Sequence, residues 1–191
     1  MLDPLVFKTL KILGEQENVK TENIVLKYST NLSKLNFSKK MDIIELWKKF
    51  KSIKLTISID GDPERNKYIR HGADSWLLKE NLAIVRKELG NKVEVKATTT
   101  VQALNTPYLA ETGQWIVREL NCNWHTSRLQ WPKHLHSNVL PVNILEESIK
   151  KIKKVNVNLL KDTMDSEIEK YRLETQFNNV CLLYTSPSPR D

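Results

Sequence analysis

A hydroxyl, a carboxylate and a guanidinium lie close together in the segment IKLTISIDGDPERNKYIR, which covers residues 53–70. The segment begins as an alternating strand, ends in an acidic turn at Asp60-Gly61 and carries Arg70 ten residues past Asp60. Its apolar side chains point to one face, and its polar side chains, ending with Ser58 and Asp60, point to the other. A polar column of this kind can hydrogen-bond a polar ligand, provided that neighbouring strands supply similar groups.

Two further predicted strands, at residues 23–31 and 93–101, also separate apolar from polar side chains and place polar groups at their C-terminal ends. The resulting set is Ser29, Asn31, Ser58, Asp60, Thr98 and Thr100. Burying such groups without partners would cost about 1–3 kcal/mol each. In β/α folds, ligands bind at the C-terminal ends of the strands, which would satisfy these groups. The alternative is a sheet with one face exposed to water.

The order of the elements predicts an α/β fold with a parallel sheet, open or closed into a barrel. The predicted strands are 23–31, 53–60, 93–101 and a less regular one within 127–141. Helical patterns separate the strands, and they occupy residues 41–50, 74–90 and 106–120. Residues 157–176 form a further pattern, a charged amphipathic helix.

The helical segments carry start and stop signals. Asp74 or Ser75 can cap the second of them and Gly90 can end it, with an apolar stripe of Leu77, Leu78, Leu82, Val85 and Leu89. Thr106 is a possible cap for the third, followed by Pro107 in its first turn. Trp76 and Trp115 are predicted to lie on apolar helix faces in the core.

Composition places the chain in the class of soluble proteins with a core. It has 191 residues, of which 40% are hydrophobic and 28% charged, and no apolar run approaches a membrane span. The N-terminus lacks the features of a signal peptide. Two distant cysteines, Cys122 and Cys181, argue against a disulfide framework and for a reducing, cytoplasmic location.

The net charge of +7 does not by itself predict a nucleic-acid partner. The lysines are dispersed, and the densest group, in SIKKIKK at residues 148–154, is interpreted as a solvated helix face. Aromatic and basic residues do not interleave as they do in a stacking platform. The last eleven residues, CLLYTSPSPRD at 181–191, break the preceding helical pattern and look like translated adapter sequence, with a disordered natural tail as the alternative.

Four stretches together resemble the radical S-adenosylmethionine enzymes, more closely those with a twitch domain. They are YSTNLSKL, LTISIDG, RNKYIRHGADSWLLKENLAIV and VKATTTVQALN. The resemblance covers residues 1–150. Its motifs are Thr30-Asn31, then Ser58-x-Asp60-Gly61, then Arg-x-Gly-x-x-x-Trp at residues 70–76.

The resemblance implies a partial (β/α) barrel and a radical mechanism. It also implies that Leu129 and Trp131 pack beside the fourth predicted strand. Enzymes of this family hold a [4Fe–4S] cluster on three cysteines spaced Cys-x3-Cys-x2-Cys, and the cluster binds and cleaves S-adenosylmethionine. The 5′-deoxyadenosyl radical then abstracts hydrogen from a substrate. An electron donor and a small-molecule or peptide substrate are the expected partners, and the identity of that substrate is open.

This chain departs from the family pattern in two motifs. It contains neither the three-cysteine motif nor the Gly-Gly-Glu motif that meets the cofactor's ammonium group. We therefore expect it to be the middle of an incomplete radical S-adenosylmethionine core, without a cluster, bound cofactor or turnover of its own. The expected organisation is a partial core at 1–150, a helical segment at 151–180 and the non-native tail at 181–191.

The resemblance assigns cofactor contacts to particular residues, while the catalytic residues stay unknown. Ser58 and Arg70 match positions that contact the cofactor's carboxylate, for which a guanidinium is suited by its bidentate geometry. Asp60 and Gly61 complete the turn that aims Ser58. The remaining matched positions are Asn31, near the cofactor or substrate, and Thr98 and Thr100, on the strand that faces ribose and adenine.

Two other interpretations remain. His134 and His136, with His125 nearby, form a His-x-His pair that can hold a metal, but no third ligand stands at a usual spacing, so we predict no metal site. The alternative function is a non-catalytic, basic α/β module that binds nucleotides or RNA.

Overall fold

The computed structural model describes residues 4–16, 18–35 and 42–154. Its strands are β1 (Val25–Thr30), β2 (Ser52–Ser58), β3 (Val93–Val101) and β4 (Asn123–Arg128). Its α-helices are α1 (Pro4–Glu15), α2 (Ile43–Trp47), α3 (Pro63–Ile69), α4 (Ser75–Leu89), α5 (Leu109–Leu120) and α6 (Val142–Lys154). Its 3-10 turns are η1 (Thr21–Asn23), η2 (Gly90–Lys92), η3 (Thr106–Tyr108), η4 (Lys133–Leu135) and η5 (Ser137–Val139).

The strands form one parallel sheet in the order β1-β2-β3-β4. Thr30 of β1 pairs with Ile57 of β2, and Ser58 of β2 pairs with Thr98 of β3. These pairings confirm the predicted α/β class and the adjacency of the first three predicted strands. In the described part of the chain the sheet is open, because β1 and β4 each have a single neighbouring strand.

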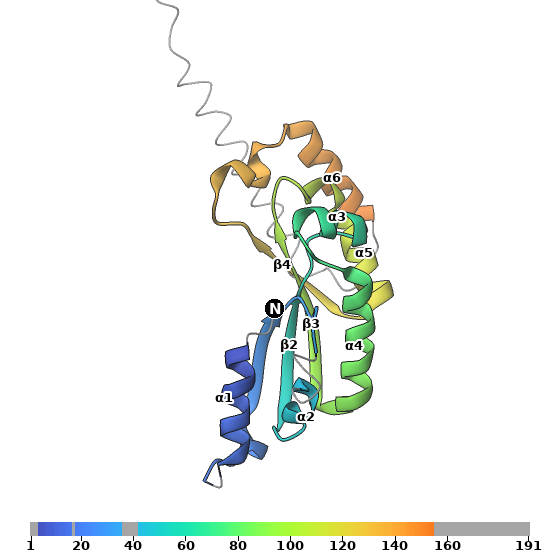
Figure 1. The fold of residues 1–191 in the computed structure, drawn as a ribbon. Coiled ribbons are helices and arrows are strands. Elements are labelled where there is room, and N and C mark those ends of the chain that lie inside the picture. The colour runs from blue at the N-terminus through green and yellow to red at the C-terminus, as the bar shows by residue number, and fades with distance from the viewer. Residues whose placement is uncertain (1–3, 17, 36–41, 155–191) are drawn as a thin grey trace, which may run out of the picture.

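The helices form a layer that follows the order of the strands. Helix α1 contacts α2, α2 contacts α4, α4 contacts α5, and α5 contacts α6. Figure 1 shows α1 beside the β1 end of the sheet, α4 along the β3 side, and the short α3 near the C-terminal ends of the strands. Crossovers of one handedness between neighbouring parallel strands place their connecting helices on one face of the sheet.

The covered face of the sheet carries the core. Along β2, the side chains of Ile53, Leu55 and Ile57 are buried, while Lys54 between them is exposed. Helix α2 and the turn after it lie in the predicted helical segment 41–50, and they bury its apolar side chains Ile43, Ile44, Leu46, Trp47 and Phe50. The apolar side chains of the helices and those of the strands therefore pack together in a single core layer.

Helix α4 begins and ends at the predicted residues. The Asp74 carboxylate accepts hydrogen bonds from the backbone N–H groups of Trp76 and Leu77, both at 3.0 Å, and Gly90 follows the last helical residue. The stripe is buried at Leu78, Leu82, Val85 and Leu89. Trp115 packs against the core as predicted.

Two residues predicted for the core are exposed. The side chain of Trp76 is 55% exposed and that of Leu77 is 38% exposed. Both lie in the first turn of α4, where the helix projects past the sheet toward α3 rather than over it. An apolar pattern on a helix cannot show where the partner layer ends.

The fourth strand lies earlier than predicted. It spans Asn123–Arg128, whereas residues 129–141 contain two 3-10 turns and no strand. Pro132 cannot donate to a strand ladder, and this favours an irregular path after β4. Trp131, predicted to pack beside the strand, is 70% exposed. Thr106 also differs from its predicted role, because its hydroxyl donates to the Gln102 carbonyl instead of capping α5.

The lysine-rich segment belongs to α6, which continues past residue 150 to Lys154. Lys150, Lys153 and Lys154 are exposed, so they form the predicted solvated helix face. The predicted helix at 157–176 and the tail at 181–191 lie outside the described residues. None of the helices in the described ranges is long and apolar enough to cross a membrane.

Candidate functional site

The uncovered face of the sheet presents a polar surface that ends in a row of hydroxyl groups. Parallel pairing aligns Ser58 with Thr98, and Thr98 with His125. One step further along, Thr100 pairs with Ser127. All of these side chains are partly or fully exposed, as expected where no described helix covers the face. The predicted site residues Ser58, Thr98 and Thr100 are therefore neighbours at the C-terminal ends of β2 and β3.

Asp60 lies directly beyond this row and ties two strands together. Its side chain is buried, and its carboxylate accepts a hydrogen bond of 2.8 Å from the backbone N–H of Thr100 on β3. The second carboxylate oxygen pairs with an Nη of Arg70, also at 2.8 Å. Because protein donors engage both oxygens, the role that this geometry supports for Asp60 is to position Arg70 and the end of β2.

Arg70 points toward the C-terminal end of β2 rather than away from the sheet. It follows α3, and its guanidinium reaches the Asp60 carboxylate across the loop. The ion pair is its sole side-chain interaction with the described residues, so further N–H groups of the guanidinium stay available to a ligand. Arg70 therefore lies at the C-terminal end of β2, with Asp60 as its anchor.

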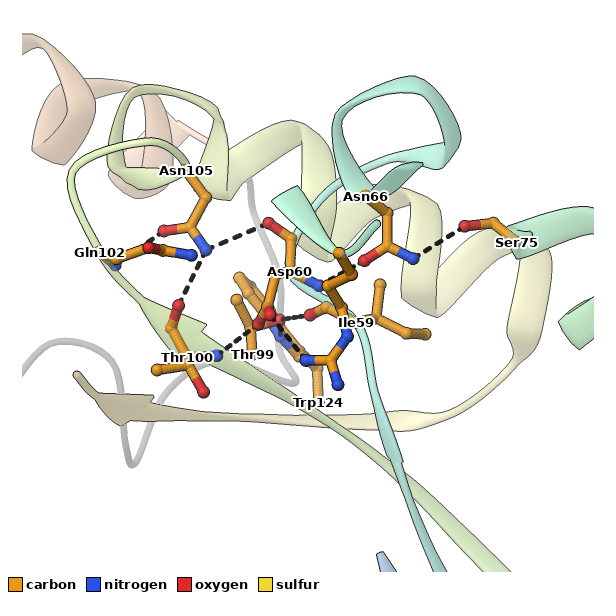
Figure 2. A network of polar contacts seen from close by, with 10 residues as sticks. Ile59, Asp60, Asn66, Ser75, Thr99, Thr100, Gln102, Asn105 and Trp124 are labelled. Carbon is orange, nitrogen blue, oxygen red and sulfur yellow. Dashed lines mark hydrogen bonds and ion pairs between the residues drawn. The ribbon is translucent and has the colours of Figure 1, made fainter. Parts of the chain in front are cut away.

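Two asparagines that the sequence analysis did not single out hold this turn from both sides. Figure 2 shows Asp60 between them. Asn66 of α3 accepts from the Asp60 N–H at 2.9 Å and donates to the Ser75 hydroxyl at 3.1 Å. Asn105 donates to the carbonyls of Asp60 and Thr100, at 3.1 and 2.9 Å. Asparagine has a low helix propensity, so its presence within α3 was the one sequence signal that Asn66 has a special role.

Gly61 is required at this turn because the chain passes close under α3. A Cβ at Gly61 would lie 2.7 Å from the Arg65 Cβ and 2.9 Å from the Asn66 nitrogen. No side chain fits at such distances without displacing backbone. The Asp60-Gly61 pair thus has a steric reason at this position as well as a turn-forming one.

Asn31 lies one strand over from this turn. It directly follows β1, whose last residue Thr30 pairs with Ile57, so Asn31 is at the level of Ser58. Its side-chain oxygen accepts from the hydroxyl and the backbone N–H of Ser33, at 3.0 and 3.3 Å. The amide nitrogen of Asn31 has no partner among the described residues, so it can contact a ligand, and the local turn holds it in place.

The middle threonine of β3 has a structural role. Thr99 is buried, donates to the Ile59 carbonyl at 2.5 Å and accepts from the indole N–H of Trp124 at 2.8 Å. Trp124 in turn packs on Gly113 of α5, where a Cβ would lie 2.2 Å from the ring. These contacts fix β3, so that Thr98 and Thr100 on either side of Thr99 face away from the helices.

Metal ligands do not gather in the described part of the chain. It contains no group of three His, Cys, Asp or Glu side chains that could hold an ion. The His134-His136 pair is not on a strand, and the Nε2 of His136 lies 3.0 Å from the Gln130 carbonyl. Cys122 is buried on the helix side, where burial raises the pKa of its thiol. These residues do not fit an iron–sulfur cluster, which needs three thiolates close together.

Comparisons of the chain with protein-family models, with curated proteins and with solved structures found no match.

Proposed function

We propose that this chain supplies the cofactor-facing strands of a radical S-adenosylmethionine enzyme, with the cofactor at the C-terminal edge of the uncovered sheet face. The observation that carries the proposal is the return of Arg70 to this edge, where Asp60 anchors it beside the hydroxyl row. A guanidinium with free N–H groups suits the carboxylate of the cofactor's methionine moiety. The hydroxyl of Ser58 suits the same carboxylate, and those of Thr98 and Thr100 suit the ribose.

The proposal concerns cofactor binding and not the radical chemistry. The chain contains no Cys-x3-Cys-x2-Cys motif, so the three thiolates of a cluster would come from outside these 191 residues. The substrate, a small molecule or a peptide, and the electron donor remain unassigned. The scarcity of cysteine is the reason that we place the enzyme in the cytoplasm.

The gene offers the first test. In-frame coding sequence before Met1 should contain Cys-x3-Cys-x2-Cys followed by Gly-Gly-Glu. A ribosome-binding site directly before Met1, with no such cysteines, would count against the enzyme.

The second test uses the complete enzyme. Arg70→Ala should weaken S-adenosylmethionine binding by about 1.5–3 kcal/mol, the usual size of a charge-assisted hydrogen bond, and should leave cluster loading intact. Arg118→Ala is the matched control, because Arg118 is an exposed arginine of α5 on the helix layer. Equal affinities of the Arg70 and Arg118 variants, measured by equilibrium dialysis, would remove the basis of the proposal.

One observation favours the alternative, a non-catalytic module for nucleotides or RNA. Lys27, Lys54 and Lys96 are exposed on the uncovered face. Lys54 pairs with Glu94 at 2.9 Å, and this contact, with a smaller contribution from Lys96, lowers the pKa of the Glu94 carboxyl. No aromatic side chain of the described strands shares that face, so bases would lack a stacking surface. Salt-sensitive binding of oligouridylate, lost on replacing Lys27 and Lys96 with glutamine, would support the module instead.

A further inference from the structure

A groove lies beside the predicted cofactor site, where the loops after β2 and β3 meet. It has a volume of about 730 Å³ and runs between α3, the first turn of α4 and the turn η3. Four of its lining side chains are large, apolar and exposed: Tyr68, Trp76, Leu104 and Tyr108. We call this surface the aromatic groove. Its lining shares no residue with the predicted cofactor contacts.

Exposed aromatic rings are concentrated in this groove. Tyr68 is 79% exposed, Trp76 is 55% exposed and Tyr108 is 36% exposed. Trp131, which lies after β4, is the sole other exposed Phe, Tyr or Trp among the described residues. Exposure of clustered apolar side chains to water is unfavourable, and a partner that covers them removes this cost. Exposed apolar patches of this kind are typical of binding surfaces.

The walls of the aromatic groove are held by the network around Asp60. Asn66 ties α3 to the Asp60 N–H, and Asn105, next to Leu104, ties the other wall to the Asp60 carbonyl. Both asparagines are buried. The two walls are therefore joined through one residue, so the groove exists before any partner arrives and binding does not have to order it.

The charges of the lining determine which partner fits. Arg65 is occupied, because it pairs with Asp62 and its guanidinium lies 3.7 Å from the centre of the Tyr108 ring. Glu64 makes no ion pair within the described part of the chain. The uncompensated charge of the groove is thus negative on a chain of net charge +7.

A phosphate would be repelled by Glu64, whereas an ammonium or guanidinium group would be attracted to it and to the ring faces that Arg65 and Lys79 leave uncovered. The rings accept cations in this structure, since the Lys79 ammonium also lies 5.7 Å from the Trp76 ring while paired with Glu119. Cation–π contacts of this kind contribute to binding at exposed sites. We propose that the aromatic groove binds a peptide segment in which a basic side chain neighbours an aromatic one.

This inference goes beyond the proposed function and does not depend on it. The test is fluorescence polarisation of the labelled peptide Gly-Lys-Phe-Lys-Gly with the full chain. The peptide should bind, and Gly-Glu-Phe-Glu-Gly should bind more weakly. Tyr68→Ala and Trp76→Ala should each weaken binding roughly 2- to 5-fold, the effect of one exposed cation–π contact. Glu64→Gln should weaken it about 2-fold, as for an exposed ion pair.

Trp131→Ala is the matched control, because it removes an exposed aromatic ring outside the groove. It should leave the affinity unchanged, and circular dichroism should show that every variant is folded. Ser58→Ala should also bind the peptide normally, which separates a failure here from a failure of the cofactor proposal. Absent binding, equal binding of the acidic peptide, an equal effect of Trp131→Ala, or displacement of the peptide by oligothymidylate would each overturn the inference.

Discussion

The two faces of the sheet use the same strands for different purposes. On β2, Ile57 faces the helices and is fully buried, while its neighbours Thr56 and Ser58 face the uncovered side and are partly exposed. Burial of apolar area stabilises the first face, at roughly 25 cal/mol per Å². The second face contributes little to stability and instead displays hydroxyl groups. In such a parallel strand, one set of alternate residues stabilises the fold, while the other set stays available to bind a ligand.

Replacing a residue on the covered face should have the largest effect. Ile57→Ala should lower the free energy of unfolding by about 2–5 kcal/mol, because it removes a buried side chain and leaves a cavity. Chemical denaturation followed by circular dichroism would measure the loss. Thr56→Ala, on the other face of the same strand, is the control and should change it by less than about 0.5 kcal/mol. Similar losses for both variants would show that the second face is also packed.

Breaking the hydrogen-bond network around Asp60, at the C-terminal ends of the strands, should have an intermediate effect on stability. Asn105→Ala leaves the carbonyls of Asp60 and Thr100 without their donor, at a cost of about 1–3 kcal/mol in the free energy of unfolding. The exposed Asn123 on β4 is the control, and Asn123→Ala should be close to neutral. If Asn105→Ala were also neutral, the other contacts of Asp60, with Asn66, Thr100 and Arg70, would be enough to hold the turn after β2.

The smallest effect on stability is expected on the uncovered face. Ser58→Ala should change the free energy of unfolding by less than about 0.5 kcal/mol, since its hydroxyl has no protein partner in the described residues. The proposed function adds that the same change in the complete protein should weaken S-adenosylmethionine binding, as measured by equilibrium dialysis. Thr56→Ala, one step further from the strand end, should bind normally. A Ser58 variant that loses stability but binds normally would reverse the division between the two faces.

Local patterns in the sequence were enough for much of the fold. The period-two alternation of β2 and the helical stripe of α2 each identify their buried side chains, because burial repeats with the geometry of the element. The cap of α4 at Asp74 is also local, since a carboxylate reaches the first N–H groups of its own helix. The prediction that Ser58, Thr98 and Thr100 share an edge required one further rule, that parallel strands end at the same side of a sheet.

Tertiary structure alone decided the partners of these residues. Nothing local indicates that both oxygens of Asp60 are bound, one of them by a backbone N–H forty residues away. The exposure of Trp76 likewise depends on where the neighbouring layer ends. Periodicity determined which side of an element is apolar, whereas long-range hydrogen bonds and layer edges determined which polar groups remain free for a ligand.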